Sequence, residues 1–454
     1  MSFFMTVKSR ITISCIIWVS ISFLTLFPIC SLGMPKEVVT VPTELNVDLR
    51  DTVSYMQIGQ IEKGKLFIEH DINLNGAVCI LPEDIVLCSK EGLIRNGIIV
   101  GNRTKIEAEK AIFDKVTIKG DWNVPIISTT LFANLDYDNS LRDVVALANP
   151  RVKNRIIVAK GEYSVRAEKD SDKCVELCDN TDFVLNGTIS LAPNGFKNYD
   201  IVLVKGKNIR ISGDGSIIGD KHSHKGKGGE WGMGIRFHHA IKASVSGLTI
   251  KDCWGDCIYV GGNSQDVMIE KCLLDHGRRQ GISVTKANGV TIRECTITNV
   301  SGINPQCAID IEPNRFDTVD NVLIEKVIVR DCEGGFLVTC AAKKNGAKTP
   351  KIGTVIIRNC QISSLSKIPV RVNRCENVLI EKSILYALEG SITVSVNETD
   401  KASVQNNTLS VDGSVIKGIK SGVNKPINNT SANNTINIKT TNHSSVKNNR
   451  IIEH

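Results

Sequence analysis

The sequence predicts an all-β solenoid, a parallel β-helix, and the first observation behind this prediction is a ladder of seven short strands. In each strand apolar residues flank a middle residue, which is polar in six of the seven. Because neighbours in a strand point to opposite faces, the flanking residues face a core and the middle residues form an outward column. The strands are Gly234–Phe237, Cys257–Val260, Gly281–Val284, Ala308–Ile311, Gly335–Val338, Pro369–Val372 and Ser391–Val394. The column is Arg236, Tyr259, Ser283, Asp310, Leu337, Arg371 and Thr393.

A second ladder repeats the pattern Val-x-Ile followed by a charged residue. Its copies begin at residues 267, 290, 322, 355 and 378, so successive copies start 23, 32, 33 and 23 residues apart. Two or three short strands at such a period are typical of a solenoid, and the period-two pattern excludes a helical repeat. Each turn then buries its apolar face only by stacking on the next turn.

Composition supports a long, narrow coil that could bind an acidic polymer. The chain has 454 residues, of which 5% are aromatic, and a formal net charge of +7. Removing the first 33 residues deletes Lys8 and Arg10 and leaves +5. A mild positive charge without a lysine- or arginine-rich run does not indicate a nucleic-acid partner. The oligomeric state stays open.

The first 33 residues are predicted to be a cleaved signal peptide. Lys8 and Arg10 precede an uncharged stretch from Ile11 to Ile29, and Ser31 and Gly33 are the small residues that a signal peptidase reads. The alternatives are a membrane anchor, because the stretch is long enough to span a bilayer, and a lipoprotein signal at Cys30. We expect a secreted, periplasmic or cell-surface protein, with no membrane span in the mature chain.

Residues 34–130 are predicted to form a first β-rich region. Short β segments recur about every ten residues between Lys65 and Trp122, punctuated by glycines. A short helix follows from Ser140 to Ala148, with Ser140 as its expected N-cap and Asp143 in its first turn.

From about Leu131 to Leu409 the chain resembles the pectin-lyase-like superfamily, and in particular secreted bacterial right-handed β-helix repeat proteins. The resemblance rests on the helix, the strand Arg155–Val158, the turn Gly161-Glu162-Tyr163 and the rungs that follow. It implies a right-handed coil over residues 131–410, with the helix as an N-terminal cap over its open end. Residues 411–454 are rich in Asn, Ser and Thr and are expected to be a tail or weak terminal rungs.

The cysteines are predicted to be mainly buried thiols. Of 15 cysteines, Cys15 and Cys30 lie in the signal segment, which leaves 13, an odd number that cannot all pair. Cys272, Cys295 and Cys360 occupy one position of the second ladder, next to inward residues. A stack of thiols that act as small hydrophobic groups explains this column. Disulfides or a metal site are the alternatives.

A candidate active site combines nine outward residues of neighbouring rungs. The candidate catalytic carboxylates are Asp256, Asp310 and Glu312, and the candidate substrate-binding residues are Arg236, His238, Tyr259, Arg279, Gln280 and Arg371. The loop Lys221–Glu230 is a candidate lid beside them. The simpler interpretations are a cross-rung ion pair between Arg279 and Glu312, and a solvated Asp310 without a role.

The resemblance implies a polysaccharide lyase or a glycoside hydrolase that acts on an acidic polysaccharide. A hydrolase needs two carboxylates, which Asp310 and Glu312 could supply. A lyase needs a base and a positive group that neutralises a uronate, which the arginines could supply. The signatures Asp-Asp, Gly-His-Gly and Arg-Ile-Lys of polygalacturonases are missing.

Three alternatives stay open at the level of sequence. The protein could be an epimerase on the same fold, or a glycan-binding or surface-structural protein without catalysis, in which the face charges neutralise one another. No cofactor is definite; calcium held by Asp256, Asp310 and Glu312 is a candidate, because it takes carboxylate oxygens.

Overall fold

The computed structural model describes residues 52–341, 349–388, 392–411 and 436–453. The predicted signal peptide and its alternatives therefore lie outside the described residues. Within those ranges, no helix is both long and apolar enough to cross a membrane.

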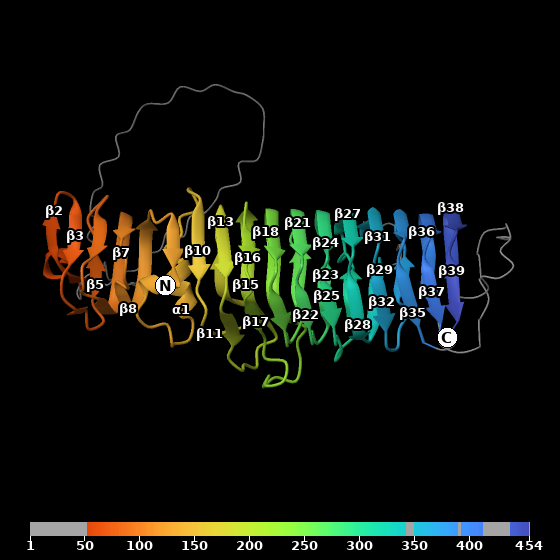
Figure 1. Ribbon diagram of the computed structural model, residues 1–454, viewed down its shortest axis with the longest axis horizontal. Helices are drawn as coiled ribbons and strands as arrows, with labels where there is room; N and C mark the ends of the chain where they lie inside the picture. Colours follow the sequence, from red (N-terminus) through yellow and green to blue (C-terminus); the bar gives the residue numbers. More distant parts are fainter. Residues whose placement is uncertain (1–51, 342–348, 389–391, 412–435, 454) are drawn as a thin grey trace, which may run out of the picture. The chain divides into compact units, whose positions relative to one another are not determined.

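The main body is a right-handed parallel β-helix, as predicted, with three strands in a typical turn (Figure 1). Strands of successive turns pair in parallel and form three rails along the stack. The first rail consists of β12 (Asp172–Leu177), β15 (Asn198–Lys207), β18 (Trp231–Ser246), β20 (Ile258–Gly261), β23 (Gln280–Val284), β26 (Cys307–Ile311), β29 (Gly334–Thr339), β33 (Val370–Asn373), β36 (Val394–Gln405) and β38 (Ile436–Lys447).

The second and third rails complete each turn. The second rail consists of β9 (Ile126–Ser128), β10 (Asn154–Val158), β13 (Thr181–Leu185), β16 (Arg210–Ser212), β21 (Ser264–Glu270), β24 (Ala287–Arg293), β27 (Thr318–Glu325), β30 (Lys351–Ile352), β31 (Thr354–Arg358) and β34 (Asn377–Glu381), together with the second halves of β18, β36 and β38. The third rail consists of β11 (Glu162–Val165), β14 (Thr188–Leu191), β17 (Ser216–Ile218), β19 (Thr249–Lys251), β22 (Leu273–Asp275), β25 (Thr296–Thr298), β28 (Ile328–Cys332), β32 (Gln361–Ser364), β35 (Ile384–Ala387), β37 (Thr408–Val411) and β39 (Arg450–Glu453).

The N-terminal β-rich region forms a sheet of its own that is mostly parallel. Its strands are β1 (Thr52–Val53), β2 (Gln60–Glu62), β3 (Lys65–Ile68), β4 (Ile72–Asn73), β5 (Val78–Ile80), β6 (Val86–Ser89), β7 (Ile94–Glu107) and β8 (Phe113–Trp122), with an antiparallel pair only between β2 and β3 among them. Two 3₁₀ turns, Tyr55–Gln57 and Thr129–Leu131, complete the described elements of this part.

The predicted helix is α1 (Ser140–Val145), which covers the first turns of the main coil through contacts with β11 and β12. Its other side packs on β8, so Leu141 and Val144 are fully buried between the two parts. The predicted N-cap is wrong: Asn139 holds that position, because the Ser140 hydroxyl is buried and donates to the Leu135 carbonyl. Asp143 accepts from the Ile118 amide and Tyr137 instead of capping the helix.

The register of the first rail follows the predicted ladder until its last rung. Arg236 pairs with Tyr259, Tyr259 with Ser283, and Ser283 with Asp310. Asp310 then pairs with Leu337 and Leu337 with Arg371. The next partner is Ser395, two residues beyond the predicted Thr393. Because strand side chains alternate with period two, a two-residue shift keeps the same face outward and leaves no trace in the pattern.

In the five rungs that carry the Val-x-Ile pattern, a single residue in left-handed conformation turns the chain from the second to the third rail. Lys271, Glu294, Lys326, Asn359 and Lys382 hold this position, with φ between 51° and 55°. The residue that follows each of them is buried, and it is Cys272, Cys295, Val327, Cys360 or Ser383. This geometry produces the thiol column. All thirteen cysteines of the described ranges are free and all but Cys178 are buried, so the disulfide alternative is wrong there.

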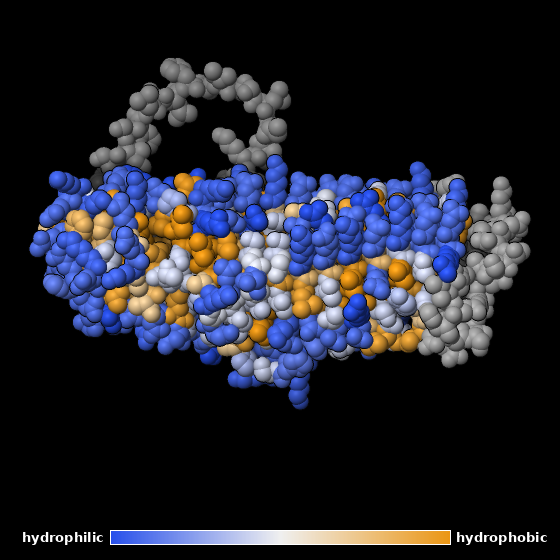
Figure 2. Space-filling view, viewed as in Figure 1, coloured by the Kyte–Doolittle hydropathy of each residue, from blue (hydrophilic) through white to orange (hydrophobic). Residues whose placement is uncertain are grey.

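Outward residues of the second rail alternate in charge. Arg293 Nε donates a hydrogen bond to Glu270 Oε2 of the preceding rung at 2.8 Å. In the same way, Arg358 Nε donates to Glu325 Oε1 of the preceding rung at 2.8 Å. Figure 2 shows regular hydrophilic columns over the C-terminal half of the stack, next to a band of hydrophobic side chains. The polar columns and the buried interior together account for the period-two pattern of the sequence.

Candidate functional site

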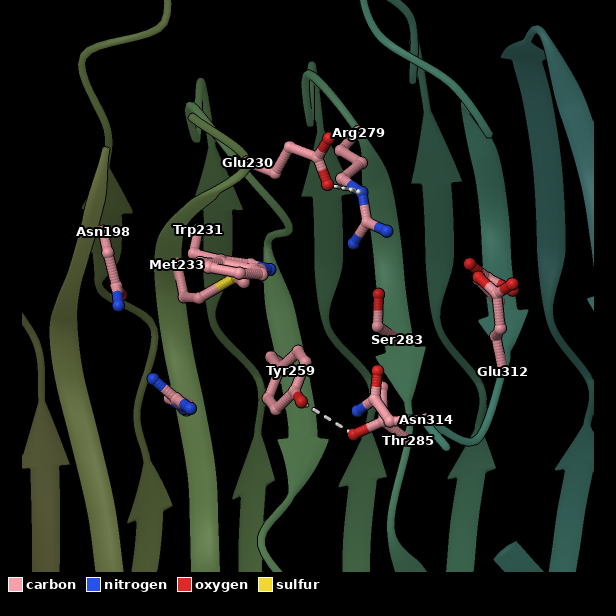
Figure 3. Close-up of a pocket in the computed structure, with 12 residues that line it drawn as sticks. Asn198, Glu230, Trp231, Met233, Tyr259, Arg279, Ser283, Thr285, Glu312 and Asn314 are labelled. Carbon is pink, nitrogen blue, oxygen red and sulfur yellow. Dashed lines mark hydrogen bonds and ion pairs between the residues drawn. The ribbon is translucent and has the colours of Figure 1, made fainter. Parts of the chain in front are cut away.

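A cleft of about 340 Å³ opens on the first rail, across the strands β18, β20, β23 and β26 (Figure 3). Five of the nine predicted residues line it: Arg236, Tyr259, Arg279, Asp310 and Glu312. The other lining residues are Asn198, Glu230, Trp231, Met233, Ser283, Thr285 and Asn314.

Asp310 is a buried carboxyl at the wall of this cleft. Asp310 is only 2% exposed, and the Gln280 side-chain amide donates a hydrogen bond to its Oδ2 at 2.7 Å. Burial, followed by the nearby negative charge of Glu312, raises the pKa of Asp310 to about 8. Oδ1 has no hydrogen-bond partner among the described residues. Asp310 therefore holds a proton at neutral pH beside an exposed second carboxylate, Glu312. The interpretation of Asp310 as a solvated residue is wrong, because neighbouring rungs cover it.

Asp256 lies behind the cleft rather than on its surface. It is fully buried; the Ser283 hydroxyl donates to its Oδ2 at 2.5 Å, and Arg279 Nη1 lies 3.6 Å from the same oxygen. Burial raises the pKa of Asp256 to about 6, while the Arg279 charge opposes this shift. Asp256 thus acts on the cleft through Arg279 and Ser283, which both line it.

A second buried carboxylate supports the other arginine of the cleft. Asp200 on β15 is 1% exposed, and its Oδ2 lies 3.6 Å from Arg236 Nη1. Burial raises the pKa of Asp200 to about 6. Arg236 also lies over the Tyr259 ring, 5.2 Å from the ring centroid, and the Tyr259 hydroxyl hydrogen-bonds Thr285. Asp200 was not predicted, because it precedes the ladder and its sequence neighbours carry no motif.

The loop that precedes β18 borders the cleft, in the place where the sequence predicts a lid. Its last residue, Glu230, has Oε2 3.6 Å from Arg279 Nε, and the next residue, Trp231, is 52% exposed (Figure 3). The predicted pair of Arg279 with Glu312 is wrong, because Arg279 contacts Glu230 and Asp256 instead. Trp231 belongs to neither ladder of the sequence, so no pattern indicates it as a site residue.

Buried contacts hold this loop against the coil. The His224 ring stacks on Trp254 at 3.9 Å and its Nδ1 lies 2.8 Å from Asp220 Oδ2. Asp220 also accepts from the Tyr199 hydroxyl at 2.6 Å. Arg278 covers the other part of this aromatic cluster, 3.7 Å from the Trp254 ring centroid, and donates to the Gly229 carbonyl. These contacts hold the loop on the coil, and its last residue, Glu230, lines the cleft.

Three further predicted residues take other positions. Gln280 is buried and contacts the cleft only through Asp310. His238 lies outside the cleft, packed beside His239 and against Gly262, and burial lowers its pKa to about 4. Arg371 lies two rungs beyond Asp310 and lines a separate cleft. The predicted single groove is thus divided, because Leu337 interrupts its polar column.

The described ranges contain no group of three or more His, Cys, Asp and Glu residues placed to hold a metal ion. The fit of Asp256, Asp310 and Glu312 to calcium is poor in this geometry, because calcium takes six to eight oxygen ligands and Asp256 is covered by Ser283 and Arg279.

Comparisons with known proteins agree with the fold. Residues 147–316 match the family model described as "Right handed beta helix region". The SPbeta prophage-derived uncharacterized protein YorA and the uncharacterized protein YclG, both of Bacillus subtilis (strain 168), are 28% identical over 162 residues and 29% identical over 184 residues. The matched parts cover 30% and 36% of this chain, and less than a third of each relative (28% and 29%).

Among solved structures, the A-module of the mannuronan C-5 epimerase AlgE6 of Azotobacter vinelandii is similar, with a TM-score of 0.51 and 12% identity. The match covers 70% of this chain and 96% of that one. A mutant tailspike protein of E. coli bacteriophage HK620, in complex with a hexasaccharide, matches with a TM-score of 0.49 and 13% identity over 70% of this chain and 62% of that one. The main coil of the protein therefore has the fold of a right-handed parallel β-helix.

Proposed function

We propose that the protein is a secreted carbohydrate-active enzyme that cleaves an acidic polysaccharide in the cleft around Asp310. The observation that carries the proposal is the pair formed by Asp310, a buried carboxyl that keeps its proton at neutral pH, and Glu312, an exposed carboxylate two residues further on, just past the end of β26. Among the described residues, neither of the two has a lysine or arginine within ion-pair distance, so no cation neutralises either carboxyl group.

This pair supports acid-base hydrolysis of a glycosidic bond. Residues i and i+2 of a strand share a face, with Cα atoms about 6.5–7 Å apart. A hydrolase needs one protonated carboxyl that gives its proton to the leaving oxygen, and one ionised carboxylate that activates water or attacks the sugar. Asp310 meets the first requirement through its raised pKa, and Glu312 supplies the second group.

The remaining residues of the cleft suit an anionic sugar chain. Trp231 presents an exposed ring, on which the apolar face of a sugar can stack. Arg236 and Arg279 line the cleft with partly exposed side chains, although each lies 3.6 Å from a buried aspartate. Guanidinium groups at such a place can bind the carboxylate of a uronate.

The same arginines favour a second candidate, β-elimination or epimerisation at a uronate. Both reactions require a positive group that stabilises the negative charge formed when the C5 proton leaves. Tyr259, whose hydroxyl lies in the cleft beside Arg236, is the candidate proton-transfer residue. The similar AlgE6 module is named a mannuronan C-5 epimerase, which makes this alternative worth testing directly.

One assay separates these reactions. Polygalacturonate, alginate, hyaluronan and neutral dextran are incubated with the protein, and reducing ends, unsaturated uronate absorbance and C5 configuration by NMR are followed. We expect new reducing ends without absorbance on an acidic polymer, and a loss of at least about 100-fold in Asp310→Asn. Absorbance with reducing ends would show a lyase, and altered configuration without cleavage an epimerase. Binding without any reaction would overturn the catalytic proposal.

A further inference from the structure

A second cleft, of about 280 Å³, lies on the same rail as the first one and was not part of the predicted site except for Arg371. Leu337 and Ile368 contribute to an apolar floor, and Lys367 and Arg371 are its two cationic lining residues. The two clefts are continuous in register, because Asp310 pairs with Leu337 and Leu337 pairs with Arg371. Adjacent strands are about 4.8 Å apart, so Arg371 lies about 10 Å along the rail from Asp310.

Lys367 is held in place by two hydrogen bonds and keeps one N–H donor free. Its ammonium group donates to Asn304 Oδ1 at 3.2 Å and to the Pro305 carbonyl. A lysine ammonium has three N–H donors, so one of them stays free for a ligand. The Lys367 stem lies across Gly334, where an added Cβ would be 3.2 Å from Cδ and 2.9 Å from Cys307 Sγ. The glycine therefore leaves the space through which the lysine reaches the cleft.

Arg371 is exposed and offers a complete set of donors. No described residue forms an ion pair, a side-chain hydrogen bond or a ring contact with its guanidinium group. This distinguishes it from Arg236 and Arg279 of the first cleft, each of which lies 3.6 Å from a buried aspartate. A guanidinium group matches a carboxylate with two parallel hydrogen bonds. Two cations without an acidic partner, above an apolar floor, select for an anionic ligand that also has an apolar face.

We propose that this cleft is an anionic subsite, in which Arg371 and Lys367 bind the carboxylate of a uronic acid unit of the same polysaccharide chain that occupies the first cleft. The apolar C–H face of the sugar ring lies on Leu337 and Ile368. The inference rests on the proposed function and deepens it: the enzyme requires a carboxylate at a fixed distance of about two rungs from the bond that reacts.

Binding to the Asp310→Asn protein tests the subsite without turnover. The probes are oligosaccharides of galacturonate, of mannuronate and of hyaluronan, each compared by calorimetry with its own carboxyl-reduced, neutral form. We expect at least one acidic probe to bind about tenfold more tightly than its neutral form. Adding Arg371→Ala or Lys367→Ala should weaken the acidic probe about tenfold and leave the neutral probe unchanged.

Arg330→Ala is the matched control, because Arg330 is an exposed arginine on the third rail, away from both clefts. It should change neither affinity, and unfolding curves check that every variant is folded. The subsite is overturned if no acidic probe is preferred, or if Arg371→Ala weakens acidic and neutral probes equally. Two results separate it from the proposed function. If the protein prefers acidic probes through Arg371 but turns over no substrate, the proposed enzyme activity alone is refuted. If wild-type protein cleaves a polysaccharide and Arg371→Ala cleaves it equally well, the subsite alone is refuted.

Discussion

Asp310 combines an outward direction with almost complete burial, and this combination gives the cleft its chemistry. The strand pattern turns the side chain away from the core, but neighbouring rungs leave it only 2% exposed. A carboxylate in such a place is poorly solvated, so the protonated form is favoured and the pKa rises to about 8. A group that loses its proton only at this pH is suited to act as an acid at neutral pH.

The raised pKa predicts that Asp310 destabilises the fold as the pH rises. Between pH 4 and pH 8 the folded carboxyl keeps its proton while the unfolded one releases it, so the free energy of unfolding falls with pH. The stability that protonated Asp310 contributes to the fold is fully present below pH 4 and is lost above pH 8. Asp310→Asn does not titrate, so we expect it to be about 1–3 kcal/mol more stable than wild type at pH 8 and nearly equal at pH 4.

Thermal or urea unfolding across this pH range measures the difference. Glu162→Gln is the control, because Glu162 is an exposed carboxylate on β11 that forms no ion pair with any described residue. An Asp310→Asn protein that is less stable than wild type at pH 8 would contradict burial of a neutral carboxyl at this site.

At the scale of the element, the turn between the second and third rails decides where the cysteines lie. In the five rungs that carry the Val-x-Ile pattern, the left-handed residue bends the chain, and the next residue is buried in the core. Small residues fit there, and a thiol behaves as a small hydrophobic group. Burial raises the pKa of Cys360 to about 12, so its thiolate is scarce at neutral pH.

The buried thiols predict slow chemical labelling. In native protein without residues 1–33, we expect DTNB to react promptly with Cys178 at most, because the other twelve cysteines are buried. Unfolding in guanidinium chloride without reductant should release all thirteen thiols. A lower thiol count in the unfolded protein would reveal disulfides and contradict the thiol column.

At the scale of the whole described body, each rung depends on its neighbours for hydrogen bonds and for burial. The last turn pairs β38 with β36, and β39 with β37. The strands β36 and β37 would lose these partners if the chain ended at Val411, and exposed strand edges associate with other chains.

We therefore expect a chain that ends at Val411 to elute as larger species in size-exclusion chromatography and to unfold at a lower temperature than the full chain. The full chain, prepared in parallel, gives the reference elution and melting curves. Identical curves for the two chains would show that the last turn contributes nothing to stability and protects no edge.

The candidate site was only partly predictable, and two residues show why. An ion pair of Arg279 with Glu312 is the simpler interpretation of the sequence, since the two lie on adjacent rungs, but the loop before β18 brings Glu230 to Arg279 from a different part of the chain. Trp231 gave no periodic pattern, because it stands where the loop joins the strand. Loops do not follow the period of the coil, so their contacts cannot be read from the ladder.

The sequence by itself determined which residues of each rung face inward and which face outward, because strand side chains alternate with period two and the coil repeats this alternation at every turn. It therefore determined the parallel β-helix and the column that contains Arg236, Tyr259 and Asp310. Only the tertiary structure decided that Asp310 is buried and that Asp256 stands behind Arg279. It also decided that Arg371 belongs to a second cleft. Burial and charge pairing depend on neighbours from other turns and from loops, and no local pattern records these neighbours.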